Sequence, residues 1–231
     1  MNSAWINKVP RLARAVKPVY RRHRREIEVK KHGGTHWRSP DFIWEALILS
    51  FSTWGNAQGS ELFTNSELHD HVRYAYLRGL PTDEARETEL RDCLTKGYVR
   101  WVARKTALLM DNFRRIEKDG GPETVKRELS SRAGSAAKVE FLRSFRGIGQ
   151  AYARNMMMDV YHEDFHNCIK IDARLKKVMN ALELTFDERK FSDAEEFFLK
   201  AARRAGLNGW EMDRLIFTYL DEVLAELQES N

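Results

Sequence analysis

Helical spacing of apolar residues is the feature that most constrains the fold of this 231-residue chain. Apolar side chains recur every three or four residues along nearly the whole length. No run alternates between apolar and polar residues as a half-buried strand would. Hydrophobic residues make up 42% of the chain, which is enough for a packed core. The sequence therefore predicts an all-α fold of about ten helices.

Glycine, proline and capping residues divide this helical pattern into segments. Ser39-Pro40-Asp41 opens the first clear core helix, which begins at Phe42 and is broken at Gly55 and Gly59. We expect the later helices at 61–77, 81–95, 98–118, 124–129, 138–145, 150–161, 173–182, 192–205 and 209–228. No internal repeat is present.

Positive charge is concentrated at the start of the chain. Residues 1–38 hold two acidic residues, Glu26 and Glu28, and eleven basic ones: Lys8, Arg11, Arg14, Lys17, Arg21, Arg22, Arg24, Arg25, Lys30, Lys31 and Arg38. The net charge of this segment is +9. The whole chain carries +5, so residues 39–231 carry −4. Such a segment suits a polyanion, although a basic helix facing solvent is an alternative. Its thin apolar stripe (Trp5, Val9, Leu12, Val16, Val19) fits a membrane surface poorly.

Cysteines and histidines predict no metal site and no cofactor. The two cysteines, Cys93 and Cys168, are too few for a four-thiolate cluster and are expected to be buried. The histidine pairs His69/His71 and His162/His166 have ligand-like spacing, but no cysteine or carboxylate partner completes a set. No apolar run approaches the roughly 18 residues that span a bilayer, and no signal-peptide core is evident. We therefore expect a cytoplasmic monomer, associated with the nucleoid if the source is bacterial.

The turn Gly147-Ile148-Gly149 joins two of the expected helices. The first amides of the second helix lack intrahelical partners and lie at the positive end of its dipole. Such a turn binds a phosphate through main-chain amides, and glycines let a DNA backbone come close. Ile148, Leu142, Phe145 and Ala153 should pack the hairpin together. This hairpin predicts binding to the DNA backbone, without any base preference.

Asp172 opens the helix that follows, after the apolar residues Ile169 and Ile171, which should bury the segment. Aspartate is a favoured N-cap, so capping alone explains the residue. A catalytic role is compatible with capping, because the helix dipole stabilises a carboxylate at this position.

The hairpin and the aspartate together resemble the helix-hairpin-helix DNA glycosylases of base-excision repair, the endonuclease III, MutY, AlkA and Ogg group. That superfamily has a hairpin of the form L-P-G-V-G-x-x-x-A and, about twenty residues later, an aspartate opening a helix. Here residues 145–153 read FRGIGQAYA and residues 169–174 read IKIDAR. The resemblance covers about residues 39–182, and residues 210–215 also resemble a closing helix.

The resemblance implies a two-lobed fold with a cleft between the lobes. We expect a basic N-terminal segment at 1–38 and a glycosylase-like domain at 39–231. Asp172 would be the catalytic carboxylate, supporting hydrolysis of the N-glycosidic bond after the base is flipped out. Ser52 and Trp54 fall where relatives place residues that line the base pocket or fill the gap. The expected DNA-binding residues are Arg146, Gly147, Ile148, Gly149, Gln150 and Ala151.

Departures from the family pattern narrow the chemistry. Bifunctional relatives carry a Schiff-base lysine where this chain has Ala151, so we expect a monofunctional enzyme. Arg146 replaces the usual proline, and Ser52 stands in the place of a glutamine. The partner would be double-stranded DNA with a damaged or modified base. The alternatives are a bifunctional glycosylase using Lys170, a non-catalytic DNA-binding protein of this fold, or an all-α module that binds no nucleic acid.

Overall fold

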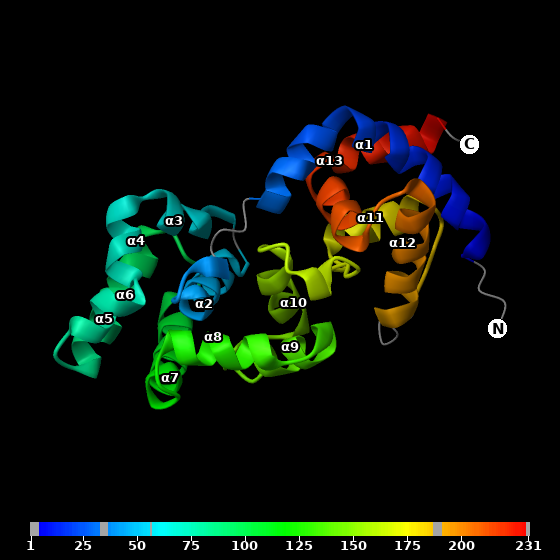
Figure 1. The fold of residues 1–231 in the computed structure, drawn as a ribbon. Coiled ribbons are helices and arrows are strands. Elements are labelled where there is room, and N and C mark those ends of the chain that lie inside the picture. Colours follow the sequence, from blue (N-terminus) through cyan, green and yellow to red (C-terminus); the bar gives the residue numbers. More distant parts are fainter. Residues whose placement is uncertain (1–4, 33–36, 56, 187–190, 230–231) are drawn as a thin grey trace. The chain divides into compact units, whose positions relative to one another are not determined.

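The computed structural model describes residues 5–32, 37–55, 57–186 and 191–229. In these ranges every regular element is a helix, which confirms the all-α prediction (Figure 1). The α-helices are α1 (Val9–His32), α2 (Phe42–Thr53), α3 (Glu61–Thr64), α4 (Ser66–Val72), α5 (Tyr74–Gly79), α6 (Asp83–Lys96), α7 (Val102–Lys118), α8 (Pro122–Ser131), α9 (Gly134–Arg143), α10 (Gln150–Met158), α11 (Ala173–Ala181), α12 (Phe191–Ala205) and α13 (Gly209–Glu229). None of these helices combines the length and the apolar composition needed to cross a bilayer.

The chain forms two compact units, each with its own core. Unit 1 comprises Met1–Gly34 and Met157–Asn231, and unit 2 comprises Thr35–Met156. The division falls inside α10, so the hairpin turn belongs to unit 2 and Asp172 to unit 1.

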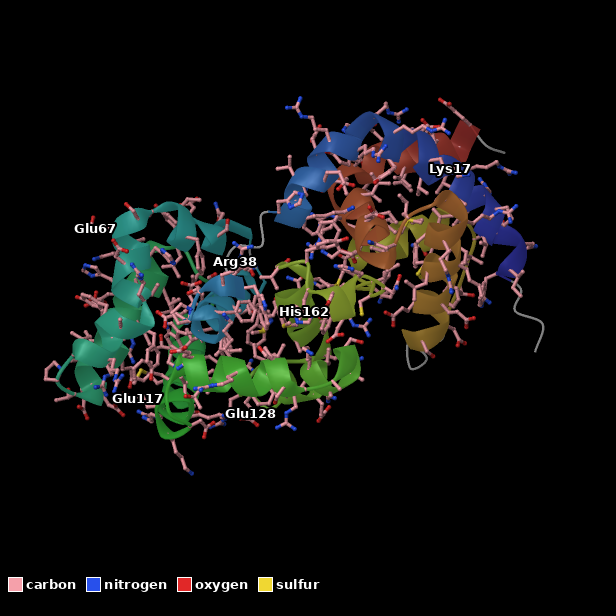
Figure 2. All side chains as sticks on the ribbon, in the orientation of Figure 1. Lys17, Arg38, Glu67, Glu117, Glu128 and His162 are labelled. Carbon is pink, nitrogen blue, oxygen red and sulfur yellow. The ribbon has the colours of Figure 1, made fainter. Side chains whose placement is uncertain are left out.

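In unit 1, the basic N-terminal segment forms a long helix that packs on two others. The blue helix α1 runs along α13, and it also contacts α12 (Figure 1). The apolar stripe seen in the sequence is buried on this side of α1. The basic residues Arg14, Lys17 and Arg21 are exposed, and Figure 2 labels Lys17 on α1. The segment is therefore amphipathic and belongs to the core of its unit, so it is neither a free arm nor a fully solvated helix.

Polar contacts reinforce the packing of α1 on α13. Lys31 forms an ion pair with the buried Glu211, and the Tyr20 hydroxyl donates to the same carboxylate at 3.2 Å. Farther along, the Arg22 guanidinium reaches Glu222 at 3.1 Å. Lys31 and Glu211 are both shielded from solvent, so this pair is screened less by salt than an exposed pair would be.

In unit 2, α2 is nearly enclosed by its neighbours. Its apolar residues are buried almost all round, which fits a central helix and not a one-sided surface helix. The Trp44 ring meets Phe113 of α7 edge-on at 5.4 Å, and Phe113 lies 4.9 Å from the Tyr74 ring. The Trp44 indole N–H donates to the Val72 carbonyl at 2.7 Å, so the polar atom of this ring is satisfied inside the core.

Two expected helices differ most from the prediction, and in addition α9 begins at Gly134 instead of Lys138 and α10 ends at Met158 instead of Tyr161. The 61–77 segment is split into α3, α4 and α5, because Asn65 and Arg73 take extended backbone angles. The Asn65 side chain accepts from the Leu68 amide at 3.2 Å and caps α4, a role for which asparagine is well suited. Helix α7 begins at Val102 and not at Tyr98, since Tyr98 and Trp101 both adopt left-handed backbone angles.

Candidate functional site

The predicted hairpin is present in unit 2, formed by α9, a tight turn and α10. The turn closes with the Ile148 amide donating to the Phe145 carbonyl at 3.1 Å. Gly147 has φ +82°, and a Cβ added there would lie 2.8 Å from the Phe51 ring. Both its backbone angle and this close approach of α2 require glycine. As predicted, Ile148, Phe145, Leu142 and Ala153 are buried.

A buried asparagine that sequence reasoning missed fixes the turn. The Asn112 side chain of α7 accepts from the Arg146 amide at 2.9 Å and donates to the Arg146 carbonyl at 3.0 Å. Asn112 has no exposed surface, so this amide meets its hydrogen-bonding needs through the backbone N–H and carbonyl of one turn residue. The Arg146 side chain is exposed and pairs with Asp111.

The beginning of α10 offers main-chain donors at the surface. The first hydrogen bond of this helix runs from the Ala153 amide to the Gly149 carbonyl at 3.0 Å, so the preceding amides lie before the intrahelical ladder. Gly149, Gln150 and Ala151 are exposed. A Cβ added at Gly149 would meet open space. This end of α10 is therefore open to an approaching anion, and the helix dipole favours negative charge there.

In unit 1, Asp172 is the N-cap of α11, as its position in the sequence predicts. One carboxylate oxygen, Oδ1, accepts from the amides of Arg174 at 2.8 Å and Leu175 at 3.1 Å. The other oxygen, Oδ2, lies 3.9 Å from the Arg174 guanidinium, and 21% of the side chain is exposed. The cap thus fixes the carboxylate through one oxygen, and neither of these two amide bonds uses the second oxygen.

The backbone before Asp172 is held by a second carboxylate, also missed by sequence reasoning. The Lys170 amide donates to Oδ1 of Asp213 on α13 at 2.9 Å. The pKa of the Asp213 carboxyl is raised to about 6, chiefly by burial and to a smaller extent by the Asp172 charge, although Arg214 and the Lys170 amide act in the opposite direction. Ile169 is buried as expected, but Ile171 is only half-buried, so Asp213 contributes to the anchoring that was assigned to Ile171.

The N-terminus of α13 positions Asp213 against the loop that precedes Asp172. Asn208 and Glu211 cap the helix reciprocally, each side chain accepting from the other's amide at 2.8 Å. The Trp210 amide donates to the His166 carbonyl at 2.9 Å, and its indole N–H donates to the Met158 carbonyl at 2.6 Å. A Cβ at Gly209 would lie 3.0 Å from the Cys168 carbonyl oxygen, so a close approach of the two segments requires glycine.

A shallow depression on the surface of unit 1 lies beside this cluster. Its volume is about 260 Å³, and it is lined by Lys30, Asp159, Trp210, Arg214 and Phe217. Arg214 bridges two carboxylates, at 2.9 Å from Asp159 and 3.9 Å from Asp213.

Arg174 lies between Asp172 and the exposed ring of Phe217. Its guanidinium carbon is 3.9 Å from the centre of that ring, while one of its nitrogens is 3.9 Å from Oδ2 of Asp172. The ring holds the guanidinium in place beside the carboxylate. The Arg174 guanidinium can therefore pair with a phosphate or stabilise the charge of the Asp172 carboxylate.

The two residues predicted for the base pocket or wedge have different surroundings in unit 2. Ser52 is fully buried, and its hydroxyl donates to the Leu49 carbonyl at 3.0 Å. Trp54 is half-buried, and its carbonyl accepts from the buried Lys105 amine at 2.7 Å. Its ring lies 6.0 Å from Trp101, which is 55% exposed. Sequence reasoning missed Trp101, which directly precedes α7, and Lys105, which lies within it. Nothing in the sequence except these positions pointed to them.

Lys105 lies inside this aromatic cluster as a buried cation. Its amine is 5.6 Å from the Trp54 ring and 5.4 Å from the Trp101 ring. Burial lowers its pKa to about 8, and the nearby Arg100 charge contributes. The amine therefore changes charge close to neutral pH while it holds the end of α2 against α7.

The predicted residues thus fall into two groups. The hairpin residues lie in unit 2 together with Ser52 and Trp54, and Asp172 lies in unit 1 together with Lys170.

Comparison with known proteins identifies the fold. No family model matches the chain, and no curated protein matches it significantly. Among solved structures, it matches Methanocaldococcus jannaschii 8-oxoguanine glycosylase/lyase in complex with a 15mer DNA containing 8-oxoguanine. The TM-score is 0.70 at 17% identity, covering 90% of this chain and 96% of that one. Methanocaldococcus jannaschii 8-oxoguanine DNA glycosylase matches with a TM-score of 0.69 at 17% identity, over 91% and 93% of the two chains. The chain therefore has the fold of these helix-hairpin-helix glycosylases, as its sequence predicts.

The raised pKa of Asp213 generates a prediction for stability. Because the folded-state pKa of about 6 exceeds the ordinary 3.8, the native state binds a proton more tightly between these values. The free energy of unfolding should therefore fall as pH rises through this window. Asp213→Asn keeps an acceptor for the Lys170 amide but does not titrate. Relative to the wild type, it should gain roughly 2–3 kcal/mol between about pH 4 and pH 7.

Urea unfolding at a series of pH values measures this difference. Asp193→Asn, the same substitution at an exposed carboxylate of α12, is the control and should show no comparable pH dependence. A constant difference between Asp213→Asn and the wild type across the window would contradict the account.

Proposed function

We propose that this protein is a monofunctional DNA glycosylase that removes a damaged or modified base. The observation that carries the proposal is the state of Asp172, whose carboxylate is fixed by two α11 amides through one oxygen while its other oxygen is directed elsewhere. One fifth of the Asp172 side chain is exposed, so the carboxylate remains accessible to a sugar while it caps the helix.

The hairpin supplies the first part of the function, which is to hold DNA. We infer that the amides at the start of α10 bind one phosphate, with Gly149 allowing the close approach. Arg146 adds a positive charge beside them, although its pairing with Asp111 reduces the charge that it offers. These contacts read the backbone and not the base.

Asp172 supplies the chemistry. The damaged nucleotide leaves the stack, and its C1′–N bond breaks as the sugar takes on positive charge. The Asp172 carboxylate stabilises that charge and accepts a proton from the water whose oxygen bonds to C1′. The base departs with the bonding electrons and is protonated, leaving an abasic site in an intact strand.

The surroundings of Lys170 and the identity of residue 151 favour a monofunctional over a bifunctional glycosylase. Alanine at 151 has no amine with which to form a Schiff base. The Lys170 ammonium lies near the carboxylates of Asp159 and Asp213, where its charge opposes the rise in pKa that burial causes in each. This arrangement suits an ion pair better than a nucleophile, so hydrolysis is the chemistry proposed here.

The first substrate to test is a duplex containing 8-oxoguanine, since both structural neighbours are described as acting on that base. Duplexes with alkylated purines and mismatched pyrimidines complete the panel.

Asp172→Asn should abolish excision while leaving DNA affinity within about twofold of the wild type. Asparagine keeps the N-cap, so the fold is retained and only the charge is lost. The measurement is strand breakage after alkali treatment, with binding measured on the same duplex. Asp193→Asn, an exposed carboxylate of the same unit, is the control and should excise normally.

Three results would count against the proposal. Full activity in Asp172→Asn would remove the catalytic role of this residue. Binding without excision of any lesion would favour a non-catalytic DNA-binding protein. Strand cleavage without alkali, trapped by borohydride, would favour the bifunctional alternative, and Lys170→Gln would then identify the amine.

A glycine pair tests the hairpin. Gly149→Ala places a methyl group in open space and should leave stability nearly unchanged, but it obstructs the phosphate and should weaken binding about tenfold. Gly147→Ala puts a side chain at positive φ against Phe51 and should cost roughly 2–4 kcal/mol of stability. Equilibrium binding and urea unfolding of both variants separate the two effects. Unchanged affinity in a folded Gly149→Ala would contradict a phosphate site at this turn.

The exposed side of α1 provides a second, weaker contribution to DNA binding. Arg14, Lys17 and Arg21 follow one another at helical spacing, and within the described ranges no acidic side chain pairs with them. We infer that they meet DNA phosphates at the flanks of the site. Deleting the segment would remove the buried side of α1 as well, so neutralisation is the cleaner test.

The triple variant Arg14→Gln, Lys17→Gln and Arg21→Gln should reduce the salt dependence of binding. Each lost phosphate contact lowers the slope of log K against log salt concentration by about 0.9, so a decrease of about 1–3 is expected. The control neutralises Arg91, Lys96 and Arg127 on α6 and α8, which changes the net charge equally. Equal slopes for the triple variant and the control would argue against a role for α1.

A further inference from the structure

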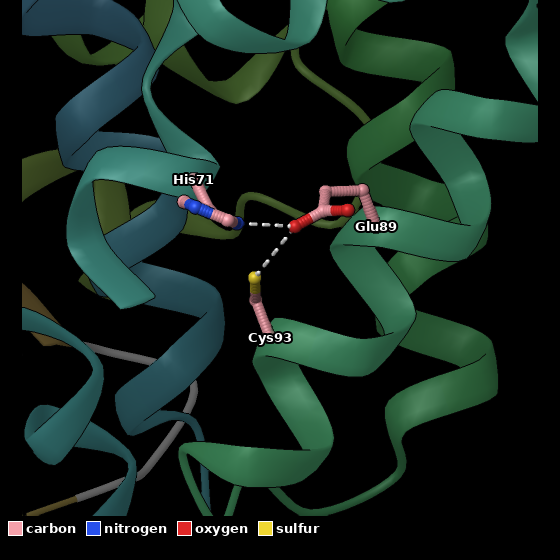
Figure 3. Close-up of side chains that lie close together, drawn as sticks. All are labelled: His71, Glu89 and Cys93. Carbon is pink, nitrogen blue, oxygen red and sulfur yellow. Dashed lines mark hydrogen bonds and ion pairs between the residues drawn. The ribbon is translucent and has the colours of Figure 1, made fainter. Parts of the chain in front are cut away.

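Three side chains with metal-binding atoms meet on the α4–α6 side of unit 2. His71 comes from α4, whereas Glu89 and Cys93 come from α6, four residues apart on one face of the helix (Figure 3). The His71 Nδ1 atom lies 2.6 Å from Oε1 of Glu89, and the Cys93 Sγ atom lies 3.7 Å from the same oxygen. All three ligand atoms lie within 4.8 Å of one another.

This geometry is close to that of a coordination site. Zinc binds nitrogen, oxygen and sulfur at about 2.0–2.3 Å, so atoms on one tetrahedral ion are about 3.3–3.8 Å apart. The Cys93–Glu89 separation already falls in this range. The His71–Glu89 contact is a hydrogen bond in the metal-free arrangement and would open by about 1 Å to admit the ion.

The charges of the cluster suit a divalent cation. Coordination uses Cys93 as a thiolate, Glu89 as a carboxylate and His71 as a neutral ring, which together carry −2. Cys93 is only 2% exposed, and without a cation a thiolate there would be costly. A divalent ion neutralises the set, and a mixed nitrogen, oxygen and sulfur donor set is one that zinc accepts.

Solvent reaches one side of the cluster. The His71 and Glu89 side chains are 41% and 27% exposed, so a water molecule has access to a fourth position. The His71 ring is also held by stacking on Tyr76, with ring centres 4.6 Å apart, which limits the freedom lost when the ring coordinates a metal.

We propose that His71, Glu89 and Cys93 form a Zn²⁺ site, with water as the fourth ligand, that ties α4 to α6. The sequence predicted no metal because the residues that complete the set with His71 are about twenty positions away in the chain, and the fold brings them to it from α6. His69, its apparent partner by spacing, lies instead beside Phe63, with ring centres 5.2 Å apart.

The site has a structural purpose that is independent of base excision. Helix α4 is only seven residues long and is interrupted on both sides, so its own hydrogen bonds stabilise it weakly. A metal bridge to the fourteen-residue α6 would hold it in place. Removal of the metal should therefore loosen this part of unit 2.

Cobalt substitution in the full-length protein tests the proposal directly. Protein treated with a chelator and then titrated with Co²⁺ should bind one equivalent and develop a thiolate-to-cobalt charge-transfer band in the near ultraviolet. Zn²⁺ should displace the cobalt and abolish the band. Competition with a chromophoric chelator gives the zinc affinity.

Variants assign the ligands. Cys93→Ser should abolish the charge-transfer band, while Cys168→Ser, at the other buried cysteine, should retain it. Cys93→Ser and His71→Gln should each weaken zinc binding by at least about 100-fold, since losing even an outer partner of a metal ligand costs about 10- to 100-fold. His69→Gln, on the same helix, should bind zinc normally. Circular dichroism of each variant confirms that it is folded.

The outcomes are decisive in both directions. Stoichiometric binding, the band, its loss in Cys93→Ser alone and a zinc-dependent rise in the melting temperature would support the site. Absence of stoichiometric binding in folded wild-type protein, or a band that persists in Cys93→Ser, would overturn it.

Discussion

The hydrogen bond between the Lys170 amide and the buried Asp213 carboxylate is the constraint on which the presentation of Asp172 depends. It fixes the backbone two residues before the cap, at a point where no regular element holds the chain. The helix that carries Asp213 is in turn anchored by its capping box and by Trp210, whose amide donates to the loop leading to Asp172 and whose indole donates to the end of α10. Two segments distant in sequence, the stretch that leads to Asp172 and the start of α13, therefore define one carboxylate position.

The hairpin is stabilised by the same kind of device in the other unit. A buried polar side chain, Asn112, satisfies both the backbone N–H and the carbonyl of Arg146, as Asp213 satisfies the Lys170 amide. In each case a side chain from a distant helix replaces the hydrogen bonds that an irregular backbone lacks. Removing either partner would leave a buried polar group unpaired, which costs about 1–3 kcal/mol. Each candidate functional segment is thus held by one polar side chain from a well-packed helix.

The sequence predicted what local chemistry determines. Helical periodicity predicted the all-α fold, glycine spacing predicted the hairpin, and Asp172 was expected as an N-cap. It did not predict Asn112 or Asp213, because a buried polar residue on an amphipathic helix has no local signature until its partner is known. The N-terminal helix was judged by its charge, although its thin apolar stripe is enough to pack on α12 and α13. The proposed metal site at His71 could not be predicted from the sequence for the same reason, since its other two ligands, Glu89 and Cys93, come from another helix.

The central claim is that the hairpin provides affinity and Asp172 provides the chemical step. Single-turnover excision, measured against protein concentration on one lesion duplex, separates the two, because the half-saturating concentration reports binding and the plateau reports the rate of bond cleavage. The account predicts that a hairpin variant raises the former and leaves the plateau unchanged, whereas loss of the Asp172 charge lowers the plateau alone. A hairpin variant that lowers the plateau, or an Asp172 variant that changes only the half-saturating concentration, would contradict it.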